Sequence, residues 1–130
     1  MHNLLLLFSH KLTQDQVKDA KDNLKVEEII HLPEDLQKKL SNIEPCGELD
    51  ILPITEITSW IRQNGKEGDF VLIQGEFGAT VYIVNYCFKN GFIPIYATTM
   101  RIYEEKVNSD GTVERKHIFK HVNFRRYVKP

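Results

Sequence analysis

The sequence lacks a long hydrophobic run. The longest one near its start, Leu4 to Phe8, is far shorter than the roughly 20 residues that span a bilayer. This run has no basic flank and no small-residue cleavage site, so it does not read as a signal peptide. We therefore expect a cytoplasmic protein with no membrane partner, in which this run is a strand.

Cysteine is scarce, since Cys46 and Cys87 are the only two in the chain. They form no CxxC pair and show no Cys/His ligand spacing, which predicts structural thiols in a reducing compartment. His117 and His121 are four residues apart, but they fall in a segment predicted as a strand, and His31 is distant in sequence from both, so they do not form the i,i+4 metal pair of a helix. We expect neither a metal site nor a cofactor.

The chain has almost no net charge, −1, but its charges are unevenly distributed. Residues 1–60 contain 6 Lys and Arg against 11 Asp and Glu, whereas residues 112–130 contain 6 against 1. A basic C-terminal segment suits a phosphate-bearing partner, although it is too short for the footprint of a long nucleic-acid duplex. Alternatively, these Lys and Arg residues protect an edge strand from aggregation.

The apolar pattern alternates between strands and helices along a chain of single-domain length. Thr13 and Gln16 form a capping-box pattern before the first helix, Pro33 is expected at the first position of the second, and Gly65 ends the third. This order predicts an α/β, Rossmann-like, mostly parallel sheet flanked by helices. The predicted strands are 3–8, 26–32, 69–74 and 92–98. Of the predicted helices, the first follows Thr13, the second begins at Pro33, the third covers 54–61 after a loop at 44–53, and the fourth covers 79–89.

The pattern changes after residue 99. Segments 101–107 and 112–121 alternate in polarity and flank Asn108-Ser109-Asp110-Gly111, which is a strong hairpin signal. Pro94 favours a place near the sheet edge for the strand that contains it. We expect one domain, 1–130, with a βα core at 1–99 and a basic β-hairpin and tail at 100–130.

In open α/β sheets, ligands bind beyond the carboxyl ends of the strands, where the strand order reverses. The loop from Gln74 to Thr80 follows a predicted strand, and its glycines, Gly75 and Gly78, would let a ligand approach the backbone. A helix that begins at Ala79 would offer free amides to an anion, and Thr80 would add a hydroxyl. The loop has neither P-loop nor GxGxxG spacing, and a tight turn without a ligand remains an alternative.

Two further segments reach the same edge. Ser9-His10 would supply a hydroxyl and an imidazole for proton transfer, unless these residues only cap the turn into the first helix. Arg101, after the fourth strand, would neutralise phosphate charge. Glu76 is a candidate base or adenine acceptor, unless it is merely a solvated carboxylate.

Three segments carry a family resemblance: LLLLFSHKLTQDQ at the start, GDFVLIQGEFGATVYIVNYCFKNGFIPIYATT in the middle and HIFKHVNFRRY near the end. Together they resemble a family of small CRISPR-associated proteins of type III systems, related to Rossmann-fold sensor domains. The resemblance implies a ring nuclease that binds cyclic oligoadenylate, most often cyclic tetra-adenylate, across a homodimer. Such a protein linearises the ring and so ends the antiviral signal.

The resemblance implies a metal-independent reaction in which a ribose 2′-hydroxyl attacks the adjacent phosphate and leaves a 2′,3′-cyclic phosphate. Three alternatives stay open: a protein that sequesters the ring, a sensor that acts through a larger effector, and an unrelated nucleotide-binding domain. The candidate catalytic residues are Ser9, His10, Glu76 and Arg101, and the candidate ligand-binding residues are Gln74, Gly75, Phe77, Gly78, Ala79, Thr80, Thr98, Thr99, His121 and Arg125.

Overall fold

In the computed structural model, which describes residues 1–8 and 10–130, five strands form one sheet in the order β2-β1-β3-β4-β5. The first four strands are parallel, and β5 pairs antiparallel with β4. This arrangement confirms the predicted α/β class, with a mostly parallel sheet and a C-terminal hairpin. The strands are β1 Leu4–Leu6, β2 Ile29–His31, β3 Phe70–Leu72, β4 Ile93–Val107 and β5 Val113–Arg126.

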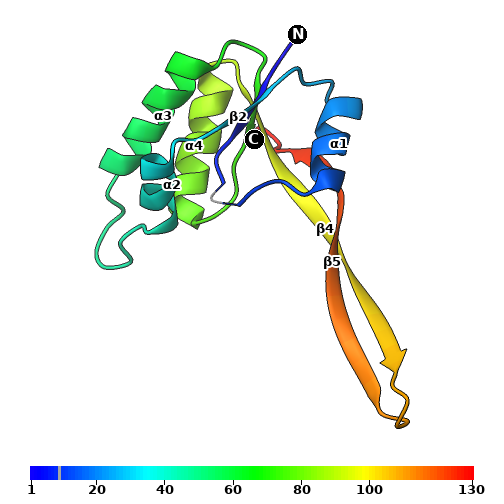
Figure 1. Ribbon diagram of the computed structural model, residues 1–130. Helices are drawn as coiled ribbons and strands as arrows, with labels where there is room; N and C mark the ends of the chain where they lie inside the picture. The colour runs from blue at the N-terminus through cyan, green and yellow to red at the C-terminus, as the bar shows by residue number, and fades with distance from the viewer. Residues whose placement is uncertain (9) are drawn as a thin grey trace.

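Helices cover both faces of the sheet (Figure 1). They are α1 Gln14–Asp22, α2 Glu34–Ser41, α3 Leu52–Asn64 and α4 Phe77–Lys89. Alternate residues of β1 point to opposite faces, so Leu5 packs in the cluster with α3 and α4 while Leu4 and Leu6 pack toward α1. Because both faces are buried, β1 needs an uninterrupted apolar run, as is typical of a central parallel strand.

The predicted capping box of α1 is confirmed. Gln16 N donates to Thr13 Oγ1 at 3.2 Å, and Thr13 N donates to Gln16 Oε1 at 3.0 Å. Two other helix starts differ from expectation. Pro33 is the N-cap of α2 rather than its first helical residue, and α3 begins at Leu52, so that Pro53 lies in its first turn instead of a loop.

Pro94 lies on β4, which is next to the edge strand β5, so it is near the sheet edge as predicted, although β4 itself has neighbours on both sides. Ile93 N donates to Asp69 O, and Ile73 N donates to Ile95 O, so the odd-numbered residues of β4 bond to β3. The nitrogen of Pro94 therefore faces the other side, where β5 ends at Arg126. A missing donor is tolerated there because no regular ladder bond is lost.

The fourth strand is much longer than expected. The predicted strand 92–98 and the predicted hairpin strand 101–107 are parts of one strand, β4, which pairs with β5 out to Val107 and Val113. A register shift at Thr98/Thr99 separates the part of this ribbon on the body from a projecting part (Figure 1). We call residues 99–121 the arm. At its tip, Gly111 has a φ of 84°, which suits glycine, as the hairpin signal predicts.

No helix in the described part of the chain is both long and apolar enough to cross a bilayer.

Candidate functional site

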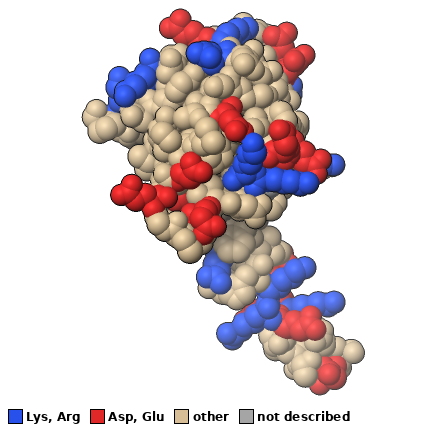
Figure 2. Space-filling view, turned by 90° about the vertical axis from the view of Figure 1, so that its left-hand side faces the viewer, with Lys and Arg blue, Asp and Glu red and all other residues tan. Residues whose placement is uncertain are grey.

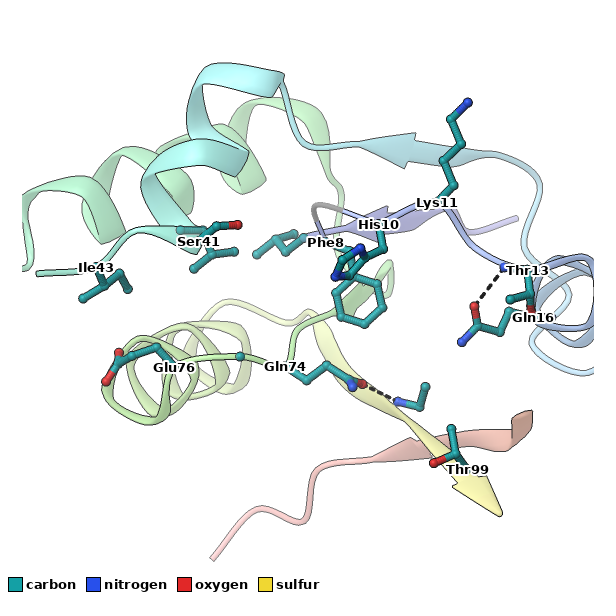
Figure 3. Close-up of a pocket in the computed structure, with 14 residues that line it drawn as sticks. Phe8, His10, Lys11, Thr13, Gln16, Ser41, Ile43, Gln74, Glu76 and Thr99 are labelled. Atoms are coloured by element: carbon teal, nitrogen blue, oxygen red, sulfur yellow. Dashed lines mark hydrogen bonds between the residues drawn. The ribbon is translucent and has the colours of Figure 1, made fainter. Parts of the chain in front are cut away.

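A cavity lies where the strand order reverses. The chain passes from β1 to β2 on one side and later returns to β3 on the other, so the connections leaving β1 and β3 diverge and leave a crevice at the carboxyl ends of these strands. The cavity there has a volume of about 660 Å³ (Figure 3). Its lining comprises Leu7, Phe8, His10, Lys11, Thr13, Gln16, Leu40, Ser41, Ile43, Gln74, Gly75, Glu76, Ala97 and Thr99.

His10 is the imidazole that lines this cavity. It follows β1, and Figure 3 shows its ring between the segment that ends α2 and the side chain of Gln74. The neighbouring Lys11 also lines the cavity, but its side chain extends away from the space around His10. An imidazole at a strand end can accept or donate a proton near neutral pH. Ser9, predicted beside it, lies outside the described residues.

Gln74 ties the end of β3 to β4. Its Oε1 accepts a hydrogen bond from Ala97 N at 2.7 Å, which fixes the oxygen of the side-chain amide toward β4. The amide nitrogen is then the group of Gln74 that can donate to a ligand. Gly75 follows, and a Cβ at this position would meet nothing within 4 Å, so the backbone is open to the cavity here.

Glu76 has a structural task that the sequence did not reveal. It is the N-cap of α4, and its two carboxylate oxygens accept from Gly78 N at 3.0 Å and Ala79 N at 2.8 Å. The helix begins at Phe77 rather than at Ala79. The expectation of free amides is therefore wrong for Gly78 and Ala79, because a carboxylate of the same chain already occupies the anion position at this helix end.

Three other predicted ligand residues of this loop lie away from the cavity. The side chain of Phe77 is 88% exposed, whereas Ala79 is buried in the core. Thr80 lines a different, smaller cavity together with Val84 and Tyr127, and its buried Oγ1 has no hydrogen-bond partner among the described residues. The structure does not bring these three side chains to His10.

Arg101 lies on the arm rather than in the cavity. Its Nε donates to His117 Nδ1 at 3.0 Å, and its guanidinium lies 5.7 Å from the ring centre of Tyr103. Thr98 bonds to Asn123 on the paired strand.

Thr99 is the predicted residue of this region that reaches the cavity. A second hollow of about 420 Å³ shares Thr13, Gln16 and Thr99 with the first and extends along the root of the arm to Lys120 and His121. The two hollows therefore adjoin.

His121 packs against α1 at the root of the arm. Its Nε2 lies 2.8 Å from Asp19 Oδ2, and its side chain is 5% exposed. Burial alone would raise the pKa of Asp19, but hydrogen bonds from Asn23 and His121 outweigh it and hold that pKa below its usual range. Arg125, also predicted as a ligand residue, lies over the ring of Tyr96 instead.

Sequence reasoning missed several polar residues of the lining. Ser41 ends α2, and the strand-end argument did not consider the ends of helices. Thr13 and Gln16 were interpreted only as a capping box. They follow His10 closely in the sequence, and their side chains line the same cavity. Within residues 1–8 and 10–130, no group of three or more His, Cys, Asp or Glu side chains is arranged to hold a metal ion.

The family is given by comparison with known sequences. A family model described as "Uncharacterized protein MJ1673 family" matches residues 2–125. The chain belongs to the MJ1673 family. It is 46% identical over 130 residues to "Uncharacterized protein MJ1673" of Methanocaldococcus jannaschii, with 98% of each chain covered. No solved structure matches it significantly. Neither description names an activity, so an assignment of function to this MJ1673-family chain depends on the site.

Proposed function

We propose that the protein is a metal-independent ring nuclease, which binds cyclic oligoadenylate in the cavity at the strand-order reversal and linearises it. The observation that carries the proposal is the cavity itself, which places His10, Gln74 and Gly75 together at the carboxyl ends of β1 and β3. Its volume of about 660 Å³ is in the usual range of small-molecule sites. The ring size proposed is four adenylates.

The proposed chemistry needs positioning and one or two proton transfers. A ribose 2′-oxygen of the ring attacks the adjacent phosphorus, and the bond from phosphorus to the 5′-oxygen breaks. The 2′-hydroxyl loses its proton and the departing 5′-oxygen gains one, so the products are a 2′,3′-cyclic phosphate and a 5′-hydroxyl. His10 is proposed to move one of these protons, and the amide nitrogen of Gln74 to donate to the phosphate.

A homodimer is part of this proposal, because a ring with two-fold symmetry can be shared by two copies that each present the same residues. Ser9 and Arg101 remain candidate catalytic residues on the basis of the sequence alone. In this chain Arg101 bonds to His117 on the arm, so we do not assign it to the cavity of its own subunit.

One observation favours a second candidate, a protein that binds the ring without cutting it. Two of the four predicted catalytic residues are engaged elsewhere, Glu76 in the cap of α4 and Arg101 with His117. A sequestering protein would need the cavity and no catalytic group. It would lower the free concentration of the signal by mass action.

The two candidates differ in their products. Radiolabelled cyclic tetra-adenylate and cyclic hexa-adenylate are incubated with excess protein in EDTA, and the products are resolved after denaturation. We expect linear fragments with 2′,3′-cyclic phosphate ends from the tetra-adenylate. Intact ring recovered from a bound complex supports sequestration instead, and failure of both rings to bind contradicts both candidates.

His10→Ala tests the role of the imidazole. We expect the cleavage rate to fall by about 10²- to 10⁴-fold with retained binding, because general acid–base catalysis typically contributes that much. His31→Ala is the matched control, since His31 is an exposed histidine at the end of β2 and does not line the cavity. Equal rates in the two variants would remove His10 from the mechanism.

A further inference from the structure

The cavity at the strand-order reversal continues into a groove at the root of the arm. This second hollow, of about 420 Å³, shares Thr13, Gln16 and Thr99 with the first. We call it the root groove. Its volume is also in the usual range of small-molecule sites. A ligand larger than one nucleotide can therefore extend from the cavity into the root groove.

One face of the arm forms a wall of the root groove, opposite the start of α1. Residues two apart on a strand point to the same side, and Ile102 pairs directly with Ile118 across the ribbon. The residues of this face that line the root groove are therefore Ile102, Glu104, Ile118 and Lys120. Both isoleucines are half-buried, whereas most of the arm is exposed. They give the root groove a sheltered apolar surface.

The charges of the root groove favour a neutral group over a phosphate. Its lining contains Asp15 and Glu104 against Lys120. The arm as a whole, residues 99–121, contains 5 Lys and Arg against 4 Asp and Glu, and Figure 2 shows both signs interspersed along it. A phosphate in the root groove would lie near two carboxylates and one cation. An uncharged base that packs on Ile102 and Ile118 buries apolar surface without this repulsion.

The polar groups of the root groove include several acceptors. A carboxylate only accepts hydrogen bonds, so Asp15 and Glu104 need a donor. His121 also lines the root groove, and its buried Nδ1 has no hydrogen-bond partner among the described residues. Its Nε2 is engaged by Asp19, and when Nε2 carries the donated proton, the neutral ring leaves Nδ1 as an acceptor. The exocyclic amino group of adenine is a donor, whereas hypoxanthine has a carbonyl oxygen at that position.

The wall that the two hollows share suits the backbone between two nucleotides. The capping box holds Gln16 Oε1 against Thr13 N (Figure 3), so the free polar group of the Gln16 side chain is its amide nitrogen, a donor. Thr99 adds a hydroxyl. Side-chain amides and hydroxyls of this kind commonly bond the phosphate and sugar oxygens of nucleic acids.

We propose that the root groove is a second nucleotide subsite, so that each chain binds two successive nucleotides. The phosphate to be cut lies in the cavity beside His10, and the base of the neighbouring nucleotide packs on Ile102 and Ile118. This inference rests on the proposed function and specifies its substrate. A two-fold dimer then offers four subsites, which matches a ring of four adenylates, whereas a ring of six leaves two nucleotides without one.

Calorimetry with linear probes tests the second subsite without requiring cleavage. The probes are adenosine 5′-monophosphate and the 5′-phosphorylated diadenylate. We expect the diadenylate to bind about 10- to 100-fold more tightly, the gain from burying apolar surface equivalent to one side chain. Two further dinucleotides carry hypoxanthine in place of one adenine or the other. The one that places hypoxanthine in the root groove should lose most of this gain.

Variants of the arm locate the effect. Ile118→Ala should weaken binding of the diadenylate by about 10-fold and leave that of the mononucleotide unchanged. Val113→Ala is the matched control, since Val113 is an exposed residue of the same strand that lines neither hollow. Glu104→Gln adds a donor and should reduce the preference for adenine over hypoxanthine, with Glu105→Gln as its control. Glu104→Gln preserves side-chain size, so this test stands even if Ile118→Ala loosens the arm.

Equal affinity of the wild type for the two adenine probes would overturn the second subsite. So would Ile118→Ala and Glu104→Gln if both behave like their controls. If cyclic tetra-adenylate is still cleaved in either case, the proposed function stands and only the root groove is excluded. Conversely, tight binding of the diadenylate that depends on Ile118, with cyclic tetra-adenylate left intact, supports the subsite and contradicts the nuclease. Failure of both adenine probes and of the ring to bind overturns both.

Discussion

His121 on β5 and Asp19 on α1 are joined by a contact of 2.8 Å between Nε2 and Oδ2, across 102 residues of sequence. The two side chains are 5% and 12% exposed. Phe124 packs beside the imidazole, with the ring centres 4.8 Å apart. This contact fixes the root of the arm to α1, which in turn supplies Thr13 and Gln16 to the edge of the cavity.

Asp19→Ala should lower the free energy of unfolding by about 1–3 kcal/mol near neutral pH, because it leaves the buried Nε2 of His121 without its partner. Asp22→Ala, an exposed carboxylate at the end of the same helix, should change it by less than about 0.5 kcal/mol. Urea unfolding followed by circular dichroism measures both. Equal losses in the two variants would mean that the contact contributes nothing.

The same carboxylate makes stability depend on acid. The pKa of Asp19 is lowered in the folded chain, so its contribution is fully present above the unfolded value of about 3.9 and is lost as the pH falls through the folded value. The difference in unfolding free energy between wild type and Asp19→Ala should therefore shrink below about pH 4. A difference that stays constant down to that range would contradict the assignment.

Glu76→Ala should destabilise the protein by about 1 kcal/mol, because the amides of Gly78 and Ala79 lose their cap. If the proposed function holds, the variant should bind cyclic tetra-adenylate at least as tightly as the wild type, because it frees two donors and removes a negative charge beside the cavity. Calorimetry measures the affinity, with Glu28→Ala as the exposed control. Loss of binding in Glu76→Ala would instead give the carboxylate a direct contact with the ligand.

The two thiols should differ sharply in reactivity. Burial raises the pKa of Cys87 to about 12, whereas Cys46 is exposed. A disulfide reagent should therefore modify one thiol per native chain rapidly and the second only after unfolding in denaturant. Cys46→Ser should remove the rapid phase entirely. A rapid phase that persists in this variant would show that Cys87 is accessible in the folded protein.

Tyr127→Phe should reduce the free energy of unfolding by about 0.5–1.5 kcal/mol, because the Tyr127 hydroxyl donates to Ile73 O at 2.6 Å. Burial raises the pKa of Tyr127, so the neutral form is favoured in the folded chain. Its contribution is present below the unfolded value of about 10 and is lost as the pH rises beyond it. The variant should therefore lose less stability than the wild type in alkali, and Tyr82→Phe, at an exposed tyrosine, should behave like the wild type.

The sequence by itself determined the local elements of this fold. Apolar runs such as 4–7 and 70–73 are buried on both faces, which only central parallel strands require, and they predicted the sheet. The capping box at Thr13 and the turn before Gly111 depend on hydrogen bonds and dihedral angles within a few residues, so they too could be read directly. The strand-end rule likewise selected His10, Gln74, Gly75 and Thr99, which all line the cavity.

Tertiary structure decided which of the remaining candidates meet. Thr80 lies one turn into α4 and turns to another cavity, a direction set by how the helix packs on the sheet. Arg101 lies two residues beyond Thr99, about 7 Å farther along a strand that continues into the arm instead of ending at the crevice. The loop from Gln74 to Thr80 did not reveal that Glu76 would cap its own helix, because a carboxylate and a bound phosphate satisfy the same amides. Contacts over long sequence distances, such as that of Asp19 with His121, depend on the packing of the whole chain and leave no local pattern.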